Sequence, residues 1–441
     1  MVPAIVLVGR PNVGKSTLFN RLTRSKDALV ADVPGLTRDR RYGFGKLGKC
    51  PYVVIDTGGF DHDGSEISAQ AMEQAEVAIE EADAVVLLLD YKDGLMPADE
   101  SLAAKLRSTN KPVTLAVNKS EGVSAEIAEA EFHSLGLGDP VAISATHGQR
   151  ISTFIERVLE AFEVDAQNEI ELELLGPRLA VVGRPNVGKS TLINRLLGSD
   201  RVLTSSEPGT TRDSILLPCQ RDGCDFVLVD TAGIRRRARI KETVERYSVV
   251  QSLKAVEDAG VAILLLDAQE GLTDQDLNLI GLVIQRGRAL TIGVNKWDGL
   301  SPTWRRQVEA QLERRLEFAS FAPVHYISAL HGSGISDLVK TALSTHKAAG
   351  KDLSTPRLNR ILADALIAHP PPVVRGRRVR LRYAHQGGRH PPVIVVHGNQ
   401  AERLPGHYRR YLANTFRRQF GLEGAALRVE FKSGQNPYSA K

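Results

Sequence analysis

The sequence has few cysteines and no long apolar run, which argues against a disulfide-stabilised protein and against a membrane protein. Its three cysteines, Cys50, Cys219 and Cys224, are too few and too irregularly spaced for a disulfide framework, and no histidines stand at metal-ligand spacing beside them. We expect them to be reduced. The longest apolar runs, AVVLLLD and VAILLLD, reach an aspartate at their seventh residue. A membrane-spanning helix needs about 20 apolar residues, so we expect no membrane segment.

We also expect no secretion leader. The opening residues MVPAIVLVGRP have neither a basic start nor a small-residue cleavage site. We therefore expect a cytoplasmic protein. Its composition, 42% hydrophobic and 25% charged residues, is typical of soluble globular proteins. A chain of 441 residues has room for about three domains.

The most informative feature is a stretch of eleven residues, VGRPNVGKSTL, which occurs at 8–18 and again, letter for letter, at 182–192. Four further stretches recur in the same order: PGLTRD and PGTTRD, VVIDTGG and VLVDTAG, AVNK and GVNK, AISA and YISA. Their offset grows from 174 to 184 residues, as insertions in loops produce. Five stretches in one order, twice over, indicate a duplicated domain. Short apolar runs alternate with helical segments in each copy, which predicts an α/β fold with a mostly parallel sheet.

The repeated stretch contains GRPNVGKS, which fits the pattern G-x-x-x-x-G-K-S of a phosphate-binding loop between a strand and a helix. The backbone N–H groups of such a loop cradle phosphates, while its lysine reaches the outer ones. Lys15 and Lys189 are therefore predicted to bridge the β- and γ-phosphates. Ser16 and Ser190 are predicted to bind Mg²⁺.

Two further motifs indicate which nucleotide binds. Asp56 and Asp230 end predicted strands and are expected to orient Mg²⁺ through water, while the glycine three residues on senses a γ-phosphate. In NKSE and NKWD, the asparagine amide and a carboxylate three residues on can pair with the donor edge of guanine. Adenine lacks that donor pair and would leave the carboxylate unpaired. The predicted nucleotide is therefore GTP.

Positive charge is concentrated at the end of the chain. Residues 355–441 contain fourteen arginines and two lysines against four acids, a net charge of +12, while the whole chain carries +5. This polarity predicts a polyanionic partner, although a solvated face that balances the acidic domains remains the alternative. The predicted order helix, strand, strand, helix, strand resembles a KH-type RNA-binding domain. Its only G-x-x-G, at 421–424, follows the last helix and is expected to be a helix-ending turn.

The five ordered stretches resemble those of the TRAFAC class of GTPases. The tandem pair, the acidic stretch between the copies and the basic tail resemble the Der (EngA) family of bacterial ribosome-assembly GTPases, over essentially the whole chain. This resemblance implies GTP hydrolysis, binding to the large ribosomal subunit and its rRNA, and a role in ribosome biogenesis. It also implies a monomer whose KH-like domain lacks the usual G-x-x-G loop.

The motifs and the resemblance together define the expected site residues. In the first copy the GTP-binding residues are Gly9, Arg10, Pro11, Asn12, Val13, Gly14, Lys15, Ser16, Thr17, Asp56, Thr57, Gly58, Gly59, Phe60, Asn118, Lys119, Glu121, Ser144 and Ala145. In the second they are Gly183, Arg184, Pro185, Asn186, Val187, Gly188, Lys189, Ser190, Thr191, Asp230, Thr231, Ala232, Gly233, Ile234, Asn295, Lys296, Asp298, Ser328 and Ala329. By resemblance, the switch threonines Thr37 and Thr211 close on Mg²⁺ and join Lys15 and Lys189 as catalytic residues. The expected Mg²⁺ ligands are Ser16, Thr37, Asp56, Ser190, Thr211 and Asp230.

Two departures from the usual GTPase pattern affect the expected chemistry. Glu121 stands where the guanine-reading carboxylate is normally an aspartate, as it is at Asp298. We expect the first copy to keep guanine binding with altered affinity. The alternative is an RNA-binding scaffold in which this copy is only structural.

The second departure concerns the water that attacks GTP. Phe60 and Ile234 stand where many small GTPases carry a water-orienting glutamine, and neither side chain can hold water. Asn12 and Asn186 resemble the asparagine that holds K⁺ beside the phosphates in potassium-activated GTPases. The resemblance therefore implies slow hydrolysis that K⁺ stimulates.

These features predict four parts of the chain: a first GTPase domain at 1–160, an acidic linker at 161–176, a second GTPase domain at 177–350 and a basic KH-like domain at 351–441. The first half of the linker has the alternative of extending the preceding helix. A tRNA-modifying or membrane-associated G protein is a rival class. The absence of an amphipathic anchor, a lipidation motif and a cysteine near the C-terminus counts against it.

Overall fold

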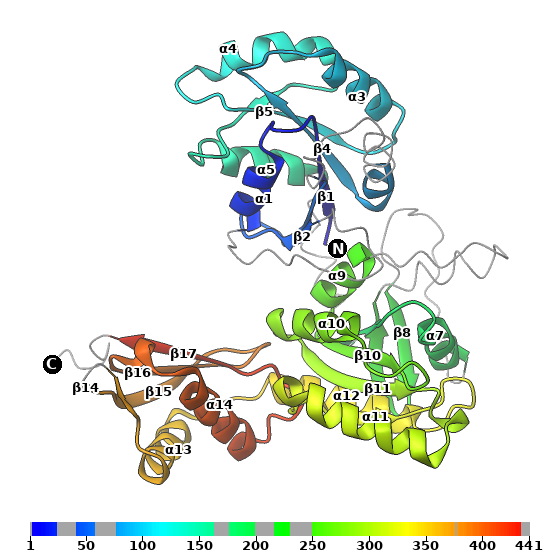
Figure 1. Ribbon diagram of the computed structural model, residues 1–441, viewed down its shortest axis with the longest axis vertical. Helices are drawn as coiled ribbons and strands as arrows, with labels where there is room; N and C mark the ends of the chain where they lie inside the picture. The colour runs from blue at the N-terminus through cyan, green and yellow to red at the C-terminus, as the bar shows by residue number, and fades with distance from the viewer. Residues whose placement is uncertain are drawn as a thin grey trace. The chain divides into compact units, whose positions relative to one another are not determined.

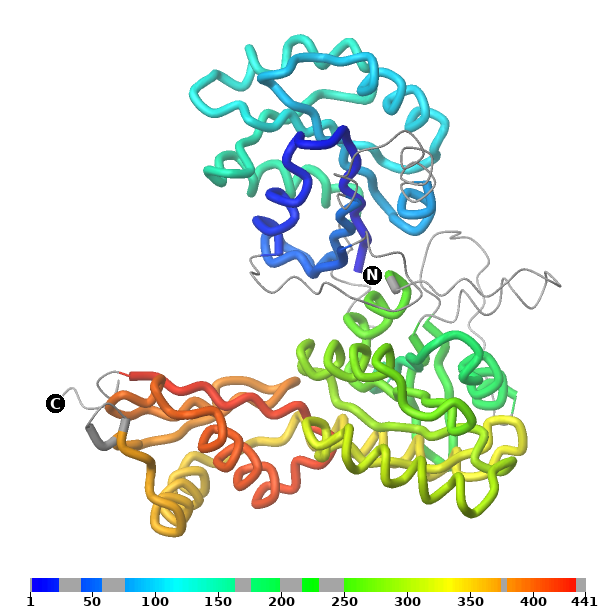
Figure 2. Tube along the Cα trace, viewed as in Figure 1, coloured from blue at the N-terminus to red at the C-terminus, as the bar shows by residue number. Residues whose placement is uncertain are grey.

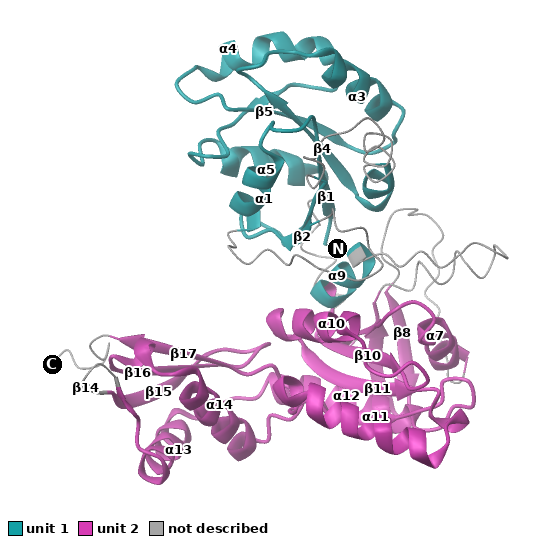
Figure 3. Cartoon of the chain, in the orientation of Figure 1, with its two compact units in different colours: residues 1–171, 248–257 teal, residues 172–247, 258–441 magenta. Residues whose placement is uncertain are grey.

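The computed structural model describes residues 2–23, 41–57, 76–162, 176–198, 216–229, 249–374 and 377–433. They form two compact units, one of Met1–Glu171 with Ser248–Glu257 and one of Leu172–Tyr247 with Asp258–Lys441 (Figure 3). Each unit is described separately below. No helix in the described ranges is both long and apolar enough to cross a membrane.

The first unit contains one six-stranded sheet with the order β2-β3-β1-β4-β5-β6. All neighbouring strands are parallel except β2 and β3 (Figure 1). Its elements are β1 (Ala4–Val8), α1 (Lys15–Thr23), β2 (Arg41–Phe44), β3 (Val53–Asp56), β4 (Ala84–Asp90), α3 (Pro97–Arg107), β5 (Val113–Asn118), α4 (Ala125–Glu129), a 3₁₀ segment Ala130–Leu135, β6 (Val141–Ala142), α5 (Ile151–Leu159), a 3₁₀ turn Glu160–Phe162 and α9 (Val249–Asp258), which groups with this unit through residue 257.

The second unit repeats the same architecture and continues into a smaller sheet. Its large sheet has the order β12-β11-β10-β7-β9-β8, which matches the first sheet strand for strand. The elements are β7 (Arg178–Val182), α7 (Lys189–Gly198), β8 (Leu217–Arg221), β9 (Cys224–Leu228), β10 (Val261–Asp267), α10 (Asp274–Gln285), β11 (Ala289–Asn295), α11 (Pro302–Arg315), β12 (Val324–Tyr326), α12 (Ile335–Ala349), α13 (Thr355–Ala368), β13 (Val373–Val374), β14 (Arg377–Arg378), β15 (Arg380–Gly388), β16 (Val393–Asn399), α14 (Gly406–Phe420) and β17 (Arg428–Ser433), with 3₁₀ turns at Trp297–Gly299, Glu317–Ala319 and Ala401–Arg403.

The central strands form because their residues are apolar on both faces. Every residue of β4 and of β10 is buried, as expected for a parallel sheet covered by helices on both sides. The register pairs Asp90 with Asn118, and Asp267 with Asn295. The motif residues that follow the parallel strands therefore meet at one edge of each sheet, which is where open α/β sheets bind ligands.

The C-terminal part of the second unit is a three-stranded sheet in which β15 and β16 are antiparallel while β16 and β17 are parallel. Helices α13 and α14 pack against each other and against this sheet. Inward-facing residues of the strands, such as Ala384, Ile394 and Val396, are fully buried. Figure 2 shows the trace passing from the large sheet into this part. The element order confirms the predicted KH-like arrangement, to which β13 and β14 add a short hairpin.

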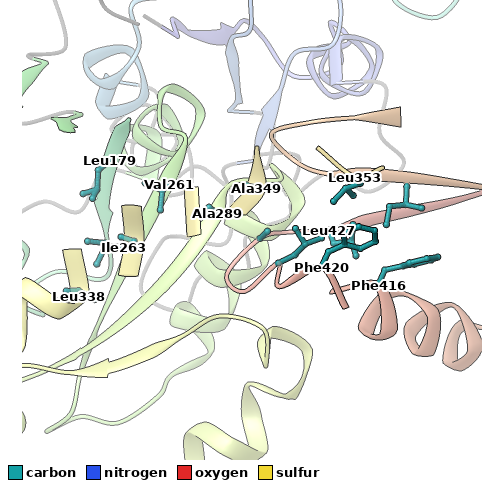
Figure 4. Packing of buried hydrophobic residues seen from close by; sticks show 14 of the residues in the cluster. Leu179, Val261, Ile263, Ala289, Leu338, Ala349, Leu353, Phe416, Phe420 and Leu427 are labelled. Atoms are coloured by element: carbon teal, nitrogen blue, oxygen red, sulfur yellow. The ribbon is translucent and has the colours of Figure 1, made fainter. Parts of the chain in front are cut away.

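One apolar core connects the large sheet of the second unit with this C-terminal part. The buried cluster includes Leu179, Ile263 and Leu338 on one side and Phe416 and Phe420 on the other (Figure 4). Backbone hydrogen bonds add to the junction, from Gly424 N to Phe321 O (2.8 Å) and from Leu290 N to Gly424 O (2.8 Å). The two parts are therefore held by shared packing as well as by the covalent chain.

The structure tests two local predictions. The chain stays helical to Phe162, two residues into the predicted linker, and residues 163–175 lie outside the described ranges. Gly421 adopts a left-handed conformation and caps the end of α14, which confirms that this G-x-x-G ends a helix. The predicted α/β fold class with two P-loop domains and a KH-like domain is also confirmed. The exact domain boundaries stay predictions.

Gly424 provides a test of the shared core. Its φ is +69°, and an added Cβ would lie 2.2 Å from Thr345 Cγ2 and 3.0 Å from Leu290 O. The matched control is Gly421, whose φ is +60° and whose nearest such neighbour is Lys351 Nζ at 3.6 Å. We expect Gly421→Ala to cost about 1–2 kcal/mol of backbone strain, and Gly424→Ala to cost about 1–3 kcal/mol more because of overpacking.

Urea unfolding of the full chain, followed by tryptophan fluorescence, measures this difference. The chain has two tryptophans, Trp297 and Trp304, and both lie in the large-sheet part of the second unit. If a substitution in the C-terminal part shifts the urea midpoint that the tryptophans report, its effect has crossed the junction between the two parts. Identical tryptophan transitions for the two variants would contradict a shared core.

Candidate nucleotide-binding sites

Each phosphate loop connects the first strand of its sheet to the helix that follows, from β1 to α1 and from β7 to α7. The second loop glycine is required by the packing. A Cβ at Gly14 would lie 2.3 Å from Asn118 Nδ2, and one at Gly188 would lie 2.3 Å from Asn295 Nδ2. The φ angles of +101° and +100° exclude most other residues as well. Glycine thus lets each loop approach the asparagine of the base motif.

The loop lysines lie inside their loops. Lys15 Nζ donates to the carbonyl oxygens of Gly9 (2.9 Å) and Arg10 (2.7 Å), and the residue is 8% exposed. Lys189 Nζ donates to Arg184 O at 2.6 Å. Both lysines begin helices, so the positive end of each helix dipole faces the loop. The arrangement places an ammonium group and the N-terminus of a helix where an anion can bind.

A buried asparagine joins three segments in each copy. Asn118 Nδ2 donates to Val13 O (2.8 Å) in the phosphate loop, while its Oδ1 accepts from Ala145 N (2.9 Å). Asn295 makes the equivalent bonds, to Val187 O (2.7 Å) and from Ala329 N (2.8 Å). The three predicted motifs in each copy are therefore brought into contact. Each asparagine is 3% exposed.

The lysine after each asparagine forms an ion pair with a buried aspartate. Lys119 Nζ lies 2.5 Å from Asp90 Oδ2, and Lys296 pairs with Asp267. Asp90 and Asp267 end β4 and β10 and are almost fully buried. These two aspartates hold the lysine side chains beside the asparagine motif.

Sequence reasoning missed a pair of buried carboxylates that hold the phosphate loops. Arg10 Nε donates to Asp99 Oδ1 (2.9 Å), and Arg184 Nε to Asp276 Oδ1 (2.9 Å). Both aspartates are inaccessible to solvent. A signal was present in the repeat, since Asp99 and Asp276 are 177 residues apart, as Asn118 and Asn295 are.

The two carboxylates predicted to read the base have different surroundings in the two copies. Glu121 Oε1 lies 2.8 Å from Lys92 Nζ, and Ser144 Oγ donates to Glu121 Oε2 at 3.1 Å. The hydrogen bond from Lys92 is the main reason why the pKa of Glu121 falls to about 2. In the second copy, a hydrogen bond from Ser328 is the main cause that lowers the pKa of Asp298. Both carboxylates are therefore ionised at neutral pH.

The described part of the Mg²⁺ set fits a hard cation. Asp56 is 1% exposed at the end of β3, and Ser16 and Ser190 lie in the first turns of α1 and α7. Carboxylate and hydroxyl oxygens are the ligands that Mg²⁺ prefers. The predicted K⁺ ligands, Asn12 and Asn186, lie in the phosphate loops with left-handed backbone conformations, at φ angles of +63° and +62°.

Other predicted residues lie outside the described ranges and stay predictions: Thr37, Gly58, Gly59, Phe60, Thr211, Asp230, Thr231, Ala232, Gly233 and Ile234. Among the described residues, no group of three or more histidine, cysteine, aspartate or glutamate side chains could hold a metal ion.

Comparison with known proteins gives matches over both parts of this architecture. A family profile described as "50S ribosome-binding GTPase" matches residues 4–119 and 178–296. A profile described as "KH-domain-like of EngA bacterial GTPase enzymes, C-terminal" matches residues 353–432.

Full-length relatives are similar over the whole chain. The GTPase Der of Marinomonas sp. (strain MWYL1) is 52% identical over 444 residues, which cover 100% of both chains. The GTPase Der of Methylococcus capsulatus (strain ATCC 33009 / NCIMB 11132 / Bath) is 53% identical over 442 residues, 100% of this chain and 95% of the relative. Among solved structures, Era in complex with MgGDPNP and nucleotides 1506–1542 of 16S ribosomal RNA matches 59% of this chain and 94% of that chain. Its identity is 22% and its TM-score 0.30.

Substituting the bridging asparagine tests its role. Asn295→Ala leaves Val187 O and Ala329 N without their partner, and each unpaired buried group costs about 1–3 kcal/mol. We expect a lower unfolding midpoint without nucleotide and a weaker affinity for GDP, measured by urea denaturation and by calorimetry. Asn399→Ala, at an exposed position of β16, is the control. A midpoint and a GDP affinity equal to those of the control would show that the bridge is dispensable.

Proposed function

Because the chain belongs to the Der family of GTPases, we propose that it binds and hydrolyses GTP in two tandem domains and assists assembly of the large ribosomal subunit. In this proposal the two nucleotide states control the contact of the basic C-terminal part with rRNA in the cytoplasm, and the protein acts as a monomer.

The observation that carries the nucleotide part of the proposal is the asparagine bridge. It holds the phosphate loop, the N-K motif and the S-A motif together in each copy. A guanine placed against Asn118 or Asn295 would leave its phosphates over the adjoining loop. The same residues therefore support one bound GTP per domain.

The side chains of the loop have defined tasks in the proposed reaction. Lys15 and Lys189 exchange the backbone carbonyls that they now bind for the β- and γ-phosphate oxygens, where an ammonium group offsets developing charge. Backbone N–H groups of the loop orient the phosphates. Mg²⁺, held by Ser16 and Asp56 and by their counterparts, neutralises phosphate charge when bound. Thr37 and Thr211 are proposed to close over the bound nucleotide.

No glutamine follows either D-x-x-G motif, so the proposal needs another source of charge compensation for hydrolysis. Asn12 and Asn186 are proposed to hold K⁺ beside the phosphates, where a cation offsets transition-state charge as an arginine finger does. The hydrolysis rate without an activating partner is proposed to be slow.

Exposed arginines of the C-terminal part that lack an acidic partner among the described residues support an RNA partner. Six exposed arginines in its described residues make no side-chain hydrogen bond or ion pair there: Arg360, Arg380, Arg382, Arg403, Arg410 and Arg418. An rRNA backbone would supply the missing anions. This observation favours the polyanion reading of the arginines over a face neutralised by the acidic domains.

Co-sedimentation tests the partner and the switch together. We expect the protein to pellet with purified large subunits, and not with small subunits, in the presence of a non-hydrolysable GTP analogue. With GDP we expect at least about tenfold less bound protein, since a switch of this kind is coupled by a few kcal/mol. The Lys15→Ala/Lys189→Ala double variant is the control for nucleotide dependence. Equal pelleting in both states, lost at moderate salt, would mean that the basic part binds RNA without a switch.

Monovalent cations test the proposed K⁺ sites. We expect GTP turnover in KCl to exceed that in NaCl about tenfold or more, because one charge beside the transition state has effects of that size. Replacing both asparagines removes the stimulation. The replacement is glycine, because the φ angles of +63° and +62° would strain alanine. Equal turnover of the unaltered chain in the two salts would refute the K⁺ role.

A further inference from the structure

The internal duplication allows the two base sites to be compared residue by residue. Glu121 in the first site is one methylene longer than Asp298 in the second. Both oxygens of Glu121 are held, Oε1 by Lys92 Nζ at 2.8 Å and Oε2 by Ser144 Oγ at 3.1 Å. The serine has a counterpart in Ser328, but the lysine does not. Its position in the second copy, two residues after the strand-ending aspartate, is occupied by Gln269.

The second site holds its carboxylate with a different side chain. His331 Nε2 lies 3.2 Å from Asp298 Oδ2. The corresponding histidine of the first copy, His147, forms no ion pair with Glu121 in the described part of the chain. Each copy therefore places one basic side chain beside its carboxylate. The residue used and the loop that supplies it differ between the copies.

The length of Glu121 explains why a lysine is useful there. A carboxylate that accepts from the ring N–H and the exocyclic amine of guanine must present two oxygens in one plane. Glutamate has one more rotatable bond than aspartate, so more conformational freedom must be lost to present that plane. Lys92 lies in the turn after β4, 29 residues before Glu121 in the sequence. Ser144 lies 23 residues after Glu121. The pair is partly exposed, so its contribution to folding stability is small and its effect is on orientation.

We propose that Lys92 is the positioning residue that makes Glu121 a guanine-reading carboxylate, so that the Lys92–Glu121 pair takes the place that Asp298, with His331 beside it, has in the second site. The inference rests on the proposed function, because it takes guanine to lie against residues 118–121. The base that the pair selects is one with both an N–H and an amine on its pairing edge. Hypoxanthine lacks the amine, so the difference in affinity between GDP and IDP measures how well the two carboxylate oxygens of Glu121 face guanine.

The test uses the full chain with Lys189→Ala, which removes the phosphate-binding lysine of the second site. Calorimetry then gives the dissociation constants of GDP and IDP at the first site. We expect Lys92→Gln, which installs the residue of the second copy, to weaken GDP binding about tenfold, as for loss of one hydrogen bond to a charged group. IDP binding changes less, so the preference for GDP over IDP falls.

Two further variants separate positioning from a general structural effect. Lys92→Arg keeps a cation within reach and should retain the preference for GDP. Glu121→Asp added to Lys92→Gln gives the first site the residues that the second copy has at these two positions, Gln269 and Asp298, and should restore the preference. Gln269→Ala, in the same Lys189→Ala chain, is the matched control and should leave the first site unchanged.

Each other outcome overturns a defined claim. If Lys92→Gln leaves the GDP affinity and the preference unchanged, Lys92 does not position Glu121, while two-site GTP binding stands. If GDP and IDP weaken equally, Lys92 acts on the domain and not on base reading, and the proposal is wrong. If the Lys189→Ala chain binds no guanine nucleotide, the proposal and the competence of the first site both fail.

Discussion

A buried asparagine in each GTPase domain joins three segments that lie far apart in the sequence. Its amide donates to the phosphate loop and its carbonyl accepts from the S-A segment, through bonds of 2.7–2.9 Å. These bonds require a glycine in the loop, because any Cβ would collide with the amide. In the proposed sites, they would fix where a base and its phosphates lie relative to one another. Each asparagine is almost fully buried, so water cannot replace its hydrogen bonds, and the proposed nucleotide sites depend on them.

The second constraint is the core that the second GTPase domain shares with the C-terminal part. Apolar side chains from both form one cluster, and Gly424 is hydrogen-bonded to Phe321 and Leu290 across the junction. Such a junction transmits rigid-body shifts, because packed cores resist continuous deformation. In the proposed switch, a nucleotide-dependent shift of the second domain would therefore be passed on to the C-terminal part that carries the six exposed arginines.

The sequence was sufficient for the duplication, the α/β class, the KH-like order and the position of each GRPNVGKS stretch between a strand and a helix, because each depends on local pattern. It was not sufficient for partners that meet only in three dimensions. Asp99 reaches Arg10 from the first turn of α3, 89 residues along the chain, and Lys92 reaches Glu121 from a turn 29 residues before it. The repeat held a signal for Asp99, since Asp276 recurs at the same offset. It held none for Lys92, because the second copy has Gln269 there.

Two working sites per chain are the central claim, and counting bound nucleotide tests it most directly. Calorimetric titration of the nucleotide-free chain with GDP should give two equivalents, and one equivalent after either Lys15→Ala or Lys189→Ala. A single equivalent in the unaltered chain, insensitive to Lys15→Ala, would contradict the account. It would mean that Glu121 does not read guanine and that the first domain serves as a scaffold.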